Sequence, residues 1–187
     1  MQIILNKGGF FEMRKDFGTK TVITPLPVLM IATYDEKGEA DVMNAAWGGQ
    51  CGPNHIAFNL GKHKTTENLK HKKEFTVSFA TKKTMAISDY FGLESGHDAD
   101  KIAKSGVHVT KSTHVDAPMI EEYPLTLECK VVDIQELLGE TRVVGEVVNM
   151  SVDESVLDDK GNIDMDKMEV ISFDSSSSSY RLLGQKV

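Results

Sequence analysis

The amino-acid sequence predicts a mainly β protein, an antiparallel β-barrel accompanied by a few α-helices. Short segments in which apolar and polar residues alternate with a period of two outnumber the segments with helical spacing. The regular succession of strands and helices that builds a parallel sheet is not sustained along the chain. No internal repeat with a period of about 20–50 residues is found. Closure into a barrel protects the edges of many short antiparallel strands, and we therefore expect that architecture.

Four strands are expected in the first half of the chain, at residues 28–34, 40–47, 55–60 and 75–80. The first should begin after Pro27, because proline cannot donate a hydrogen bond to a sheet ladder. A polar segment containing Gly38 separates the first two strands and is typical of a hairpin turn. In the third strand Ile56, Phe58 and Leu60 share one face, and the fourth strand alternates in the same way.

Three helices are expected, at residues 65–73, 84–91 and 98–104. In the first, a threonine should cap the N-terminus. Glu67 lies in the first turn of this helix and lysines lie in its last turn, which is the order that complements a helix dipole. The third helix should end at Gly106, because glycine readily adopts the left-handed conformation that follows a helix.

Strands return in the second half of the chain, at residues 123–135 and 142–152, joined by a turn at 137–140. The acidic residues 153–166 show no clear period and are predicted to form a loop. A short closing strand is expected at 169–173. The five serines of residues 175–179 are interpreted as a solvated linker.

The length of 187 residues indicates one domain over residues 1–187, with an N-terminal extension at about 1–20 and a C-terminal tail at 175–187. The net charge of −7, from 21 basic and 28 acidic residues, argues against a nucleic-acid-binding protein. No run of about 18 apolar residues predicts a membrane-spanning helix.

A cytoplasmic location is expected, because the first residues lack the charged and apolar regions of a signal peptide. The two cysteines, Cys51 and Cys129, cannot build a disulfide framework. The six histidines are scattered without the spacing of a metal site, so no metal is expected. A Gly-x-Ser-x-Gly nucleophile motif is absent too, and no side chain is assigned a catalytic role.

The first candidate binding segment is Asn44-Ala45-Ala46-Trp47, followed by two glycines. The small alanines permit a flat ligand or another backbone to approach closely, and Asn44 offers both donors and an acceptor. Trp47, the only tryptophan, would border an aromatic ligand. The residues alone slightly favour a purely structural interpretation, in which the small residues and glycines let a barrel strand turn a corner.

The second candidate segment is the predicted start of the first helix. Lys64, Thr65, Thr66 and Asn68 combine a positive charge with hydroxyl and amide donors there. Helix N-termini bind phosphate through unpaired backbone amides and the helix dipole. The alternative is ordinary capping of the helix by threonine, and Glu67 favours that alternative because its charge would repel a phosphate.

Seven pieces of the sequence, taken in order, resemble the flavin reductase-like, FMN-binding split-barrel family and its flavoredoxin-like branch. They are Asn44–Trp47, Lys64–Leu69, Glu74–Phe79, Asp100–Gly106, Pro118–Lys130, Gly145–Val148 and Tyr180–Gly184. The resemblance runs from about residue 15 to the end of the chain, and the order of the pieces carries it.

The resemblance implies a Greek-key split barrel that forms a homodimer and holds FMN near the dimer interface. Asn44, Ala45, Ala46 and Trp47 would border the flavin ring and ribityl chain. Lys64, Thr65, Thr66 and Asn68 would hold the phosphate. The flavin would carry the chemistry while the protein supplies position, shielding and electrostatics.

Three functions follow as hypotheses. The first is an FMN-dependent oxidoreductase that takes electrons from NADH or NADPH and passes them to a second, small-molecule acceptor or to a redox partner protein. The second is an FMN-binding electron carrier without NAD(P)H turnover of its own. The third is a dimeric split-barrel scaffold that binds no cofactor.

Overall fold

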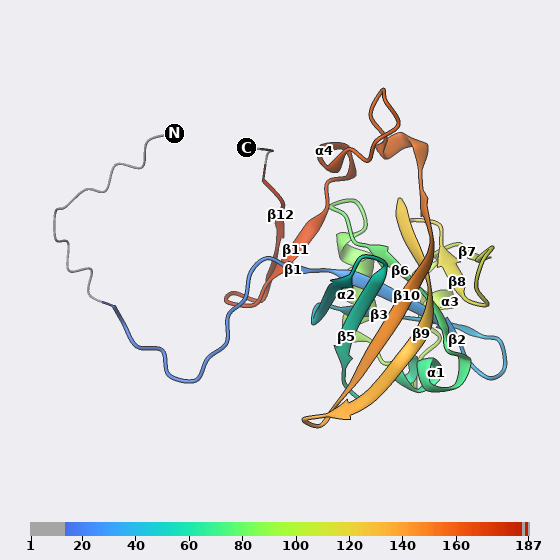
Figure 1. Ribbon diagram of the computed structural model, residues 1–187, viewed down its shortest axis with the longest axis horizontal. Coiled ribbons are helices and arrows are strands. Elements are labelled where there is room, and N and C mark those ends of the chain that lie inside the picture. The colour runs from blue at the N-terminus through green and yellow to red at the C-terminus, as the bar shows by residue number, and fades with distance from the viewer. Residues whose placement is uncertain (1–13, 185, 187) are drawn as a thin grey trace.

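The computed structural model describes residues 14–184 and 186, and a seven-stranded antiparallel sheet forms its centre (Figure 1). The strands are β2 (Leu29–Tyr34), β3 (Ala40–Ala45), β4 (Gly48–Gly52), β5 (His55–Leu60), β6 (Glu74–Phe79), β9 (Leu125–Leu137) and β10 (Glu140–Val152). Their spatial order is β3-β2-β6-β9-β10-β5-β4. The edge strands β3 and β4 follow each other in the chain, so the sheet curls into a barrel that is split between them.

Smaller elements surround this barrel. A three-stranded sheet contains β1 (Leu26–Pro27), β11 (Ile171–Asp174) and β12 (Ser179–Leu182), and a hairpin contains β7 (Val109–Lys111) and β8 (Pro118–Ile120). The helices are α1 (Lys64–Lys72), α2 (Met85–Leu93), α3 (Lys101–Ser105) and α4 (Met165–Met168), with a 3₁₀ turn at Glu154–Val156. In Figure 1 the three-stranded sheet lies to one side of the barrel, and the described residues before β1, from 14 onward, run away from the body.

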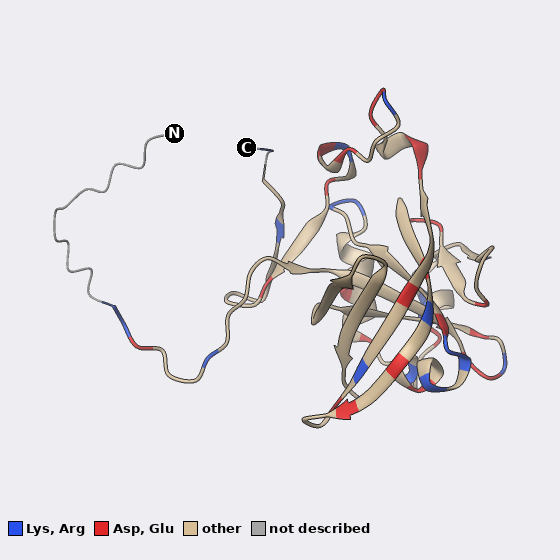
Figure 2. Cartoon of the chain, in the orientation of Figure 1, with Lys and Arg blue, Asp and Glu red and all other residues tan. Residues whose placement is uncertain are grey.

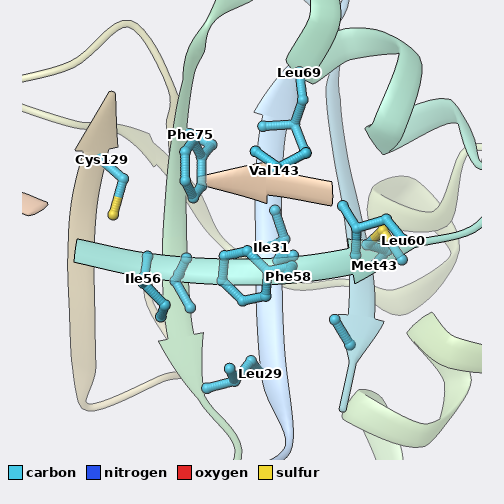
Figure 3. Close-up of a cluster of buried hydrophobic side chains, with 12 residues drawn as sticks. Leu29, Ile31, Met43, Ile56, Phe58, Leu60, Leu69, Phe75, Cys129 and Val143 are labelled. Atoms are coloured by element: carbon cyan, nitrogen blue, oxygen red, sulfur yellow. The ribbon is translucent and has the colours of Figure 1, made fainter. Parts of the chain in front are cut away.

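The hydrophobic core fills the barrel (Figure 3). Phe58 of β5 and Phe75 of β6 meet edge to face inside it, with ring centroids 6.3 Å apart. Gly145 of β10 leaves room for Phe75, since a Cβ atom at this glycine would lie 2.4 Å from the Phe75 Cζ atom. A second buried cluster joins the outer face of β2 to α2, where Met30 packs with Phe91. Both faces of β2 are therefore covered, which explains its continuous apolar sequence.

Charged residues of both signs are interspersed over the β9–β10 hairpin and α1 (Figure 2). Lys70 of α1 pairs with Glu136 of β9 at 2.7 Å, and Lys82 pairs with Glu169 at 3.0 Å. Within the part of the chain that the structure describes, no helix is long and apolar enough to cross a membrane. The predicted extension at 1–20 and tail at 175–187 lie partly outside the described residues, which exclude 1–13, 185 and 187.

The prediction of a mainly β barrel is confirmed. The third strand has the bounds expected for it, and the strands at 28–34, 75–80, 123–135, 142–152 and 169–173 correspond to β2, β6, β9, β10 and β11 with small shifts. The three predicted helices correspond to α1, α2 and α3. Gly106 ends α3 with φ at +72°, the left-handed conformation expected of it. The turn at 137–140 is tight, with Leu138 and Gly139 also at positive φ.

Four local predictions are wrong. The second strand ends at Ala45 instead of Trp47, because the chain turns there and starts the unpredicted strand β4. His63, not a threonine, is the N-cap of α1. The loop at 153–166 contains the 3₁₀ turn and the beginning of α4. Ser175 to Ser178 form the turn between β11 and β12, and Ser179 begins β12. The Asp174 carboxylate accepts hydrogen bonds from the backbone N–H and hydroxyl of Ser176 in this turn.

Candidate functional site

A sharp corner between β3 and β4 exposes the only tryptophan. The corner is held by a hydrogen bond from the Asn59 backbone N–H to the Trp47 carbonyl, at 2.8 Å. Gly48 lies so close to β5 that a Cβ atom there would come within 2.4 Å of Phe58 Cδ1 and 2.6 Å of the Ala57 carbonyl. Only glycine fits this approach, and the residue before it, Trp47, is 62% exposed.

The corner forms one wall of an open cavity of about 410 Å³, which we call the corner cavity. Residues 43–47 line it from one side, and residues 59–61 with His63 line it from the other. Glu140 at the start of β10 and Phe173 of β11 complete the lining. The predicted Trp-bearing segment therefore shares one space with the loop that precedes α1, whereas the predicted residues Lys64, Thr65, Thr66 and Asn68 do not line it.

The residues of the first candidate segment occupy different environments. Ala45 is buried in the barrel core, while Ala46 is half-buried at the corner. The half-buried Asn44 faces α2 and donates from Nδ2 to the Ser88 carbonyl at 3.0 Å. Gly92 of α2 permits this contact, because a Cβ atom there would lie 3.2 Å from the Cβ of Asn44. The chain thus turns a corner here, as the structural interpretation expects, and the residues of the first candidate segment line a cavity at that corner.

The polar side chains at the start of α1 are directed into the protein. The Thr65 hydroxyl donates to Asp41 Oδ2 at 2.6 Å, and the Thr66 hydroxyl donates to the Gly61 carbonyl at 2.9 Å. Asn68 Nδ2 donates to the Thr33 hydroxyl at 3.0 Å. All three side chains are buried, and none of them lines the corner cavity.

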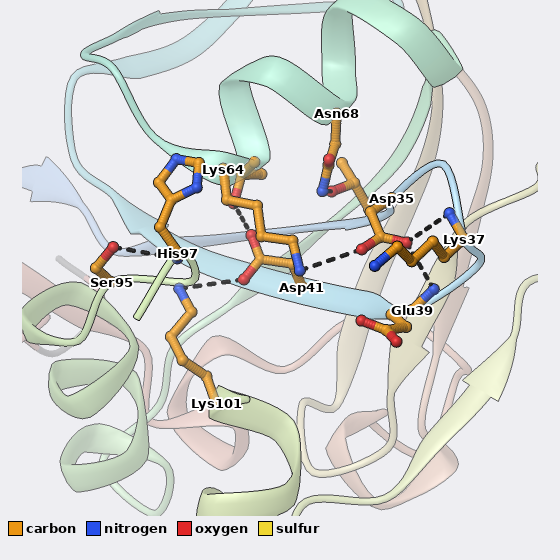
Figure 4. A network of polar contacts seen from close by, with 11 residues as sticks. Asp35, Lys37, Glu39, Asp41, Lys64, Asn68, Ser95, His97 and Lys101 are labelled. Carbon is orange, nitrogen blue, oxygen red and sulfur yellow. Dashed lines mark hydrogen bonds and ion pairs between the residues drawn. The ribbon is translucent and has the colours of Figure 1, made fainter. Parts of the chain in front are cut away.

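The residues just before α1, rather than the helix itself, reach the corner cavity. Gly61 and His63 line the cavity, and His63 caps the helix without a side-chain hydrogen bond. The first-turn amides consequently lack a side-chain cap, and they carry the partial positive charge of the helix start. The Lys64 ammonium lies 3.2 Å from the Asp35 carboxylate (Figure 4), and Lys64 does not line this cavity.

A buried ion pair lies behind the helix start. Lys101 of α3 approaches Asp41 of β3 at 3.5 Å, and the two side chains are 3% and 4% exposed. Burial lowers the pKa of Lys101, while the attraction of Asp41 acts in the opposite direction. Together with Lys64 and the loop around Gly96 and His97, this pair lines a second cavity of about 550 Å³.

Sequence reasoning did not identify Phe173, Glu140 or His63 as residues of the corner cavity. Phe173 belongs to the predicted closing strand and Glu140 to the predicted hairpin turn, so both were assigned structural places only. His63 stood among the scattered histidines. The signal that could have identified His63 is its position directly before a helix start. A residue that caps a helix poorly leaves the backbone amides of the first turn without a side-chain partner.

The split antiparallel barrel is a fold found among flavin reductase-like proteins. A family profile described as "Flavin reductase like domain" matches residues 22–167 of the chain. The chain therefore belongs to the flavin reductase-like family, and its similarity to two flavoredoxin structures places it in the flavoredoxin branch.

The first of these structures is flavoredoxin of Desulfovibrio vulgaris (Miyazaki F), at 32% identity and a TM-score of 0.88, covering 94% of this chain and 96% of that one. The second is a flavoredoxin from Methanosarcina acetivorans, at 29% identity and a TM-score of 0.84, covering 94% of each chain. The uncharacterized protein YddH of Escherichia coli (strain K12) is 28% identical over 156 residues, which are 78% of this chain and 80% of YddH. These matches agree with the split-barrel fold expected from the sequence.

Proposed function

We propose that this protein is an FMN-dependent oxidoreductase whose flavin occupies the corner cavity. The observation that carries the proposal is the convergence of the exposed Trp47 corner and the loop just before α1, through Gly61 and His63, on one open space. A volume of about 410 Å³ lies in the range of small-molecule and cofactor sites. Membership in the flavin reductase-like family supplies the chemical class.

The residues of the corner cavity fit a flavin. The Trp47 indole and the Phe173 ring offer flat apolar surfaces, while Asn44, Ala45 and Ala46 form the strand beside them. Glu140 Oε2 is buried and has no hydrogen-bond partner among the described residues, so it can accept from a ribityl hydroxyl. The bound flavin supplies the hydride and electron transfer, and the protein's task is to orient it and to limit its contact with water.

The phosphate is assigned to the first turn of α1. Backbone amides, rather than threonine hydroxyls, would face it, because Thr65, Thr66 and Asn68 have their hydrogen bonds inside the fold. These three side chains would hold the turn in place from behind. Lys64 adds positive charge nearby, although Asp35 shares it. Helix starts of this kind bind phosphate without a dedicated side chain.

Flavin binding is tested by titrating the purified protein with FMN and following flavin fluorescence and the visible spectrum. Trp47→Ala should weaken binding and shift the spectrum, because it removes the flat wall of the cavity. Val132→Ala is a matched control, since Val132 is also an exposed apolar residue of the barrel but lies outside the cavity. A wild-type protein that takes up no FMN would contradict the proposal and favour the cofactor-free scaffold.

NADH or NADPH is the proposed electron donor, and a small molecule or redox protein is the proposed acceptor. The assay mixes the FMN-loaded protein anaerobically with each nicotinamide cofactor and follows bleaching of the flavin band. Bleaching by either cofactor supports the reductase. The similarity to flavoredoxins favours one alternative, an electron carrier without NAD(P)H turnover. That alternative is supported if bleaching occurs only after a separate reductase is added.

The proposed assembly is a homodimer. Apolar side chains are exposed in the segment before β1, where Phe17, Val22 and Ile23 are more than half exposed, and at Trp47. A second copy of the chain could cover these side chains. Light scattering on the eluting protein should therefore give twice the mass of the chain. A cytoplasmic location is also proposed, because Cys51 and Cys129 are both free thiols.

A further inference from the structure

Trp47 borders not only the corner cavity but also a further open cavity of about 440 Å³, which we call the outer groove. The groove is lined by residues 47–51, residues 57–59 of β5, Arg142 of β10, and Ile23 and Leu26. The two cavities share Trp47 and Asn59. They are therefore neighbours, and a ligand long enough to leave one of them can enter the other.

The strand alternation places Arg142 at the border of the two cavities. Phe58 of β5 and Val143 of β10 belong to the barrel core. Because side chains alternate along a strand, the next residue of β5, Asn59, and the preceding residue of β10, Arg142, face outward. These two residues are partners across the ladder, and Arg142 Nη1 donates to Asn59 Oδ1 at 3.5 Å. The guanidinium thus lies beside a residue that both cavities share.

Arg142 carries a charge that the fold itself does not use. Among the described residues that line the groove, Arg142 alone is charged, and it is half-buried. In the described part of the chain it forms no ion pair with a carboxylate, whereas Arg181 pairs with Asp174 at 2.6 Å. A guanidinium has five N–H donors in a fork that matches phosphate, and the contact with Asn59 uses one of them. The remaining donors are suited to an anionic ligand.

The corner cavity has the opposite charge at the nearest point of the same strand. Glu140, two residues before Arg142 on β10, lines that cavity, and its carboxylate would repel an anion. NADH and NADPH each combine an uncharged dihydronicotinamide ring with an anionic pyrophosphate. The two neighbouring cavities match these two parts, with the ring directed toward the flavin in the corner cavity and the pyrophosphate toward Arg142.

We propose that the outer groove binds the pyrophosphate of the nicotinamide dinucleotide that reduces the flavin, and that Arg142 donates hydrogen bonds to it. The inference rests on the proposed function, because it takes NADH or NADPH as the electron donor. It adds to that function a place for the donor outside the flavin cavity, and a residue that recognises its charge.

The direct test is the binding of ADP-ribose, which contains the pyrophosphate but has no nicotinamide and cannot reduce a flavin. The FMN-loaded protein is titrated with ADP-ribose in a calorimeter. Arg142→Gln removes the charge, while Arg142→Lys keeps the charge without the fork. Lys130→Gln is the matched control, because it removes one positive charge from the neighbouring strand β9 outside both cavities.

Arg142→Gln should weaken ADP-ribose binding by about tenfold or more, the effect of losing a hydrogen bond to a charged group. Arg142→Lys should lose less, since a point charge remains. Lys130→Gln should change the affinity little. A similar affinity in wild type and Arg142→Gln would contradict the assignment, as would a wild-type protein that does not bind ADP-ribose.

A kinetic test separates recognition of the phosphates from an effect on the fold. Under anaerobic conditions, Arg142→Gln should raise the concentration of NADH or NADPH that gives half the maximal rate of flavin bleaching, and should leave that maximal rate nearly unchanged. The hydride donor 1-benzyl-1,4-dihydronicotinamide carries no phosphate. It should therefore bleach the wild-type protein and Arg142→Gln equally fast, and an equal loss with both kinds of donor would overturn the inference.

The outcomes distinguish this inference from the proposed function. A protein that takes up no FMN, or whose bound FMN is bleached by neither NADH nor NADPH, overturns the reductase and this inference together. Bleaching that does not depend on Arg142 overturns the inference alone. If Arg142→Gln does not fold, Arg142→Lys carries the test, because a loss of ADP-ribose affinity supports the assignment and an unchanged affinity contradicts it.

Discussion

The ion pair between Asp41 and Lys101 gives a quantitative prediction about the stability of the fold. The two side chains are 4% and 3% exposed, and their charged atoms lie 3.5 Å apart. Lys101→Met keeps most of the side-chain volume but leaves the Asp41 carboxylate buried with only the Thr65 hydroxyl, at 2.6 Å, as a polar side-chain partner. Breaking a buried pair in this way typically costs about 3–5 kcal/mol of unfolding free energy.

The unfolding free energy is measured by urea denaturation followed by far-UV circular dichroism. A loss of this size would lower the melting temperature by on the order of 10 °C for a chain of this length. Lys82→Met is the control, because it breaks the exposed pair between Lys82 and Glu169 and should cost at most about 1 kcal/mol. The double variant Asp41→Asn/Lys101→Met should recover much of the loss, since no uncompensated charge remains.

The pH dependence provides a second measurement on the same residue. Burial lowers the pKa of Lys101 from its usual 10.5, so between the lowered value and 10.5 the unfolded chain holds more protons than the folded one. Lys101 therefore makes the unfolding free energy rise with pH in that window, and Lys101→Met should remove this contribution. The reasoning is refuted if Lys101→Met costs no more than Lys82→Met.

Three further predictions concern close packing and buried charge. Gly145→Ala should lower the free energy of unfolding, measured by urea denaturation, by about 1–3 kcal/mol, because its Cβ would lie 2.4 Å from Phe75 Cζ. Gly49→Ala is the control and should be nearly neutral, since open space surrounds its Cβ. Equal costs in the two variants would contradict this reasoning. Gly96→Ala should lower the melting temperature, because its Cβ would lie 2.4 Å from Asp41 Oδ1, and Asp41→Asn should not relieve the clash. Burial raises the pKa of Glu128, but hydrogen bonds from the His114 backbone, the Asn149 amide and the His114 ring outweigh it, and the net shift is downward. The stability that Glu128 contributes is thus present above about pH 4.5 and is lost as the pH falls through the lowered pKa. Glu128→Gln should therefore flatten the acid limb of a curve of unfolding free energy against pH. An unchanged acid limb would argue against a lowered pKa of Glu128.

The strands that could be predicted from sequence are those whose side chains alternate against a core. In β5 and β6 every second residue enters the barrel, and the period of two places them with little ambiguity. The strand β4 has the sequence Gly-Gly-Gln-Cys-Gly, which contains no apolar alternation, and it pairs with β5 through its backbone. Its existence follows from the corner at Trp47, which depends on contacts with β5 that the local sequence does not reveal.

The serine turn illustrates the same limit. A run of serines is typical of a linker, because serine neither packs nor favours regular structure. In the fold, Asp174 lies directly before the run and forms an ion pair with Arg181, seven residues further on, at 2.6 Å. The pair spans the β11–β12 hairpin, in which the backbone ladder makes Phe173 and Tyr180 cross-strand partners. The serines therefore form a turn because the strands on either side of them pair, and composition alone gives no information about that pairing.

The candidate site could be located from sequence, but the direction of its side chains could not. Asn44 and Trp47 were identified and line one cavity, while the predicted helix start lies next to the loop that lines it and contributes no side chain. Thr65, Thr66 and Asn68 were expected to face a phosphate. Which face of a helix start points inward depends on how the helix docks, and here Thr65 meets Asp41 of β3, 24 residues earlier in the chain.

That inward direction changes what substitutions at the helix start should reveal. If Thr66 held the phosphate directly, Thr66→Ala would weaken FMN binding without changing the stability of the protein. Because its hydroxyl instead donates to the Gly61 carbonyl, the same substitution should lower both the melting temperature and the FMN affinity, as the loop that lines the cavity loosens. Trp47→Ala should lower the affinity alone, since the exposed indole contributes little to the folded core. Comparing the two variants therefore separates residues that contact the flavin from residues that shape the backbone around it.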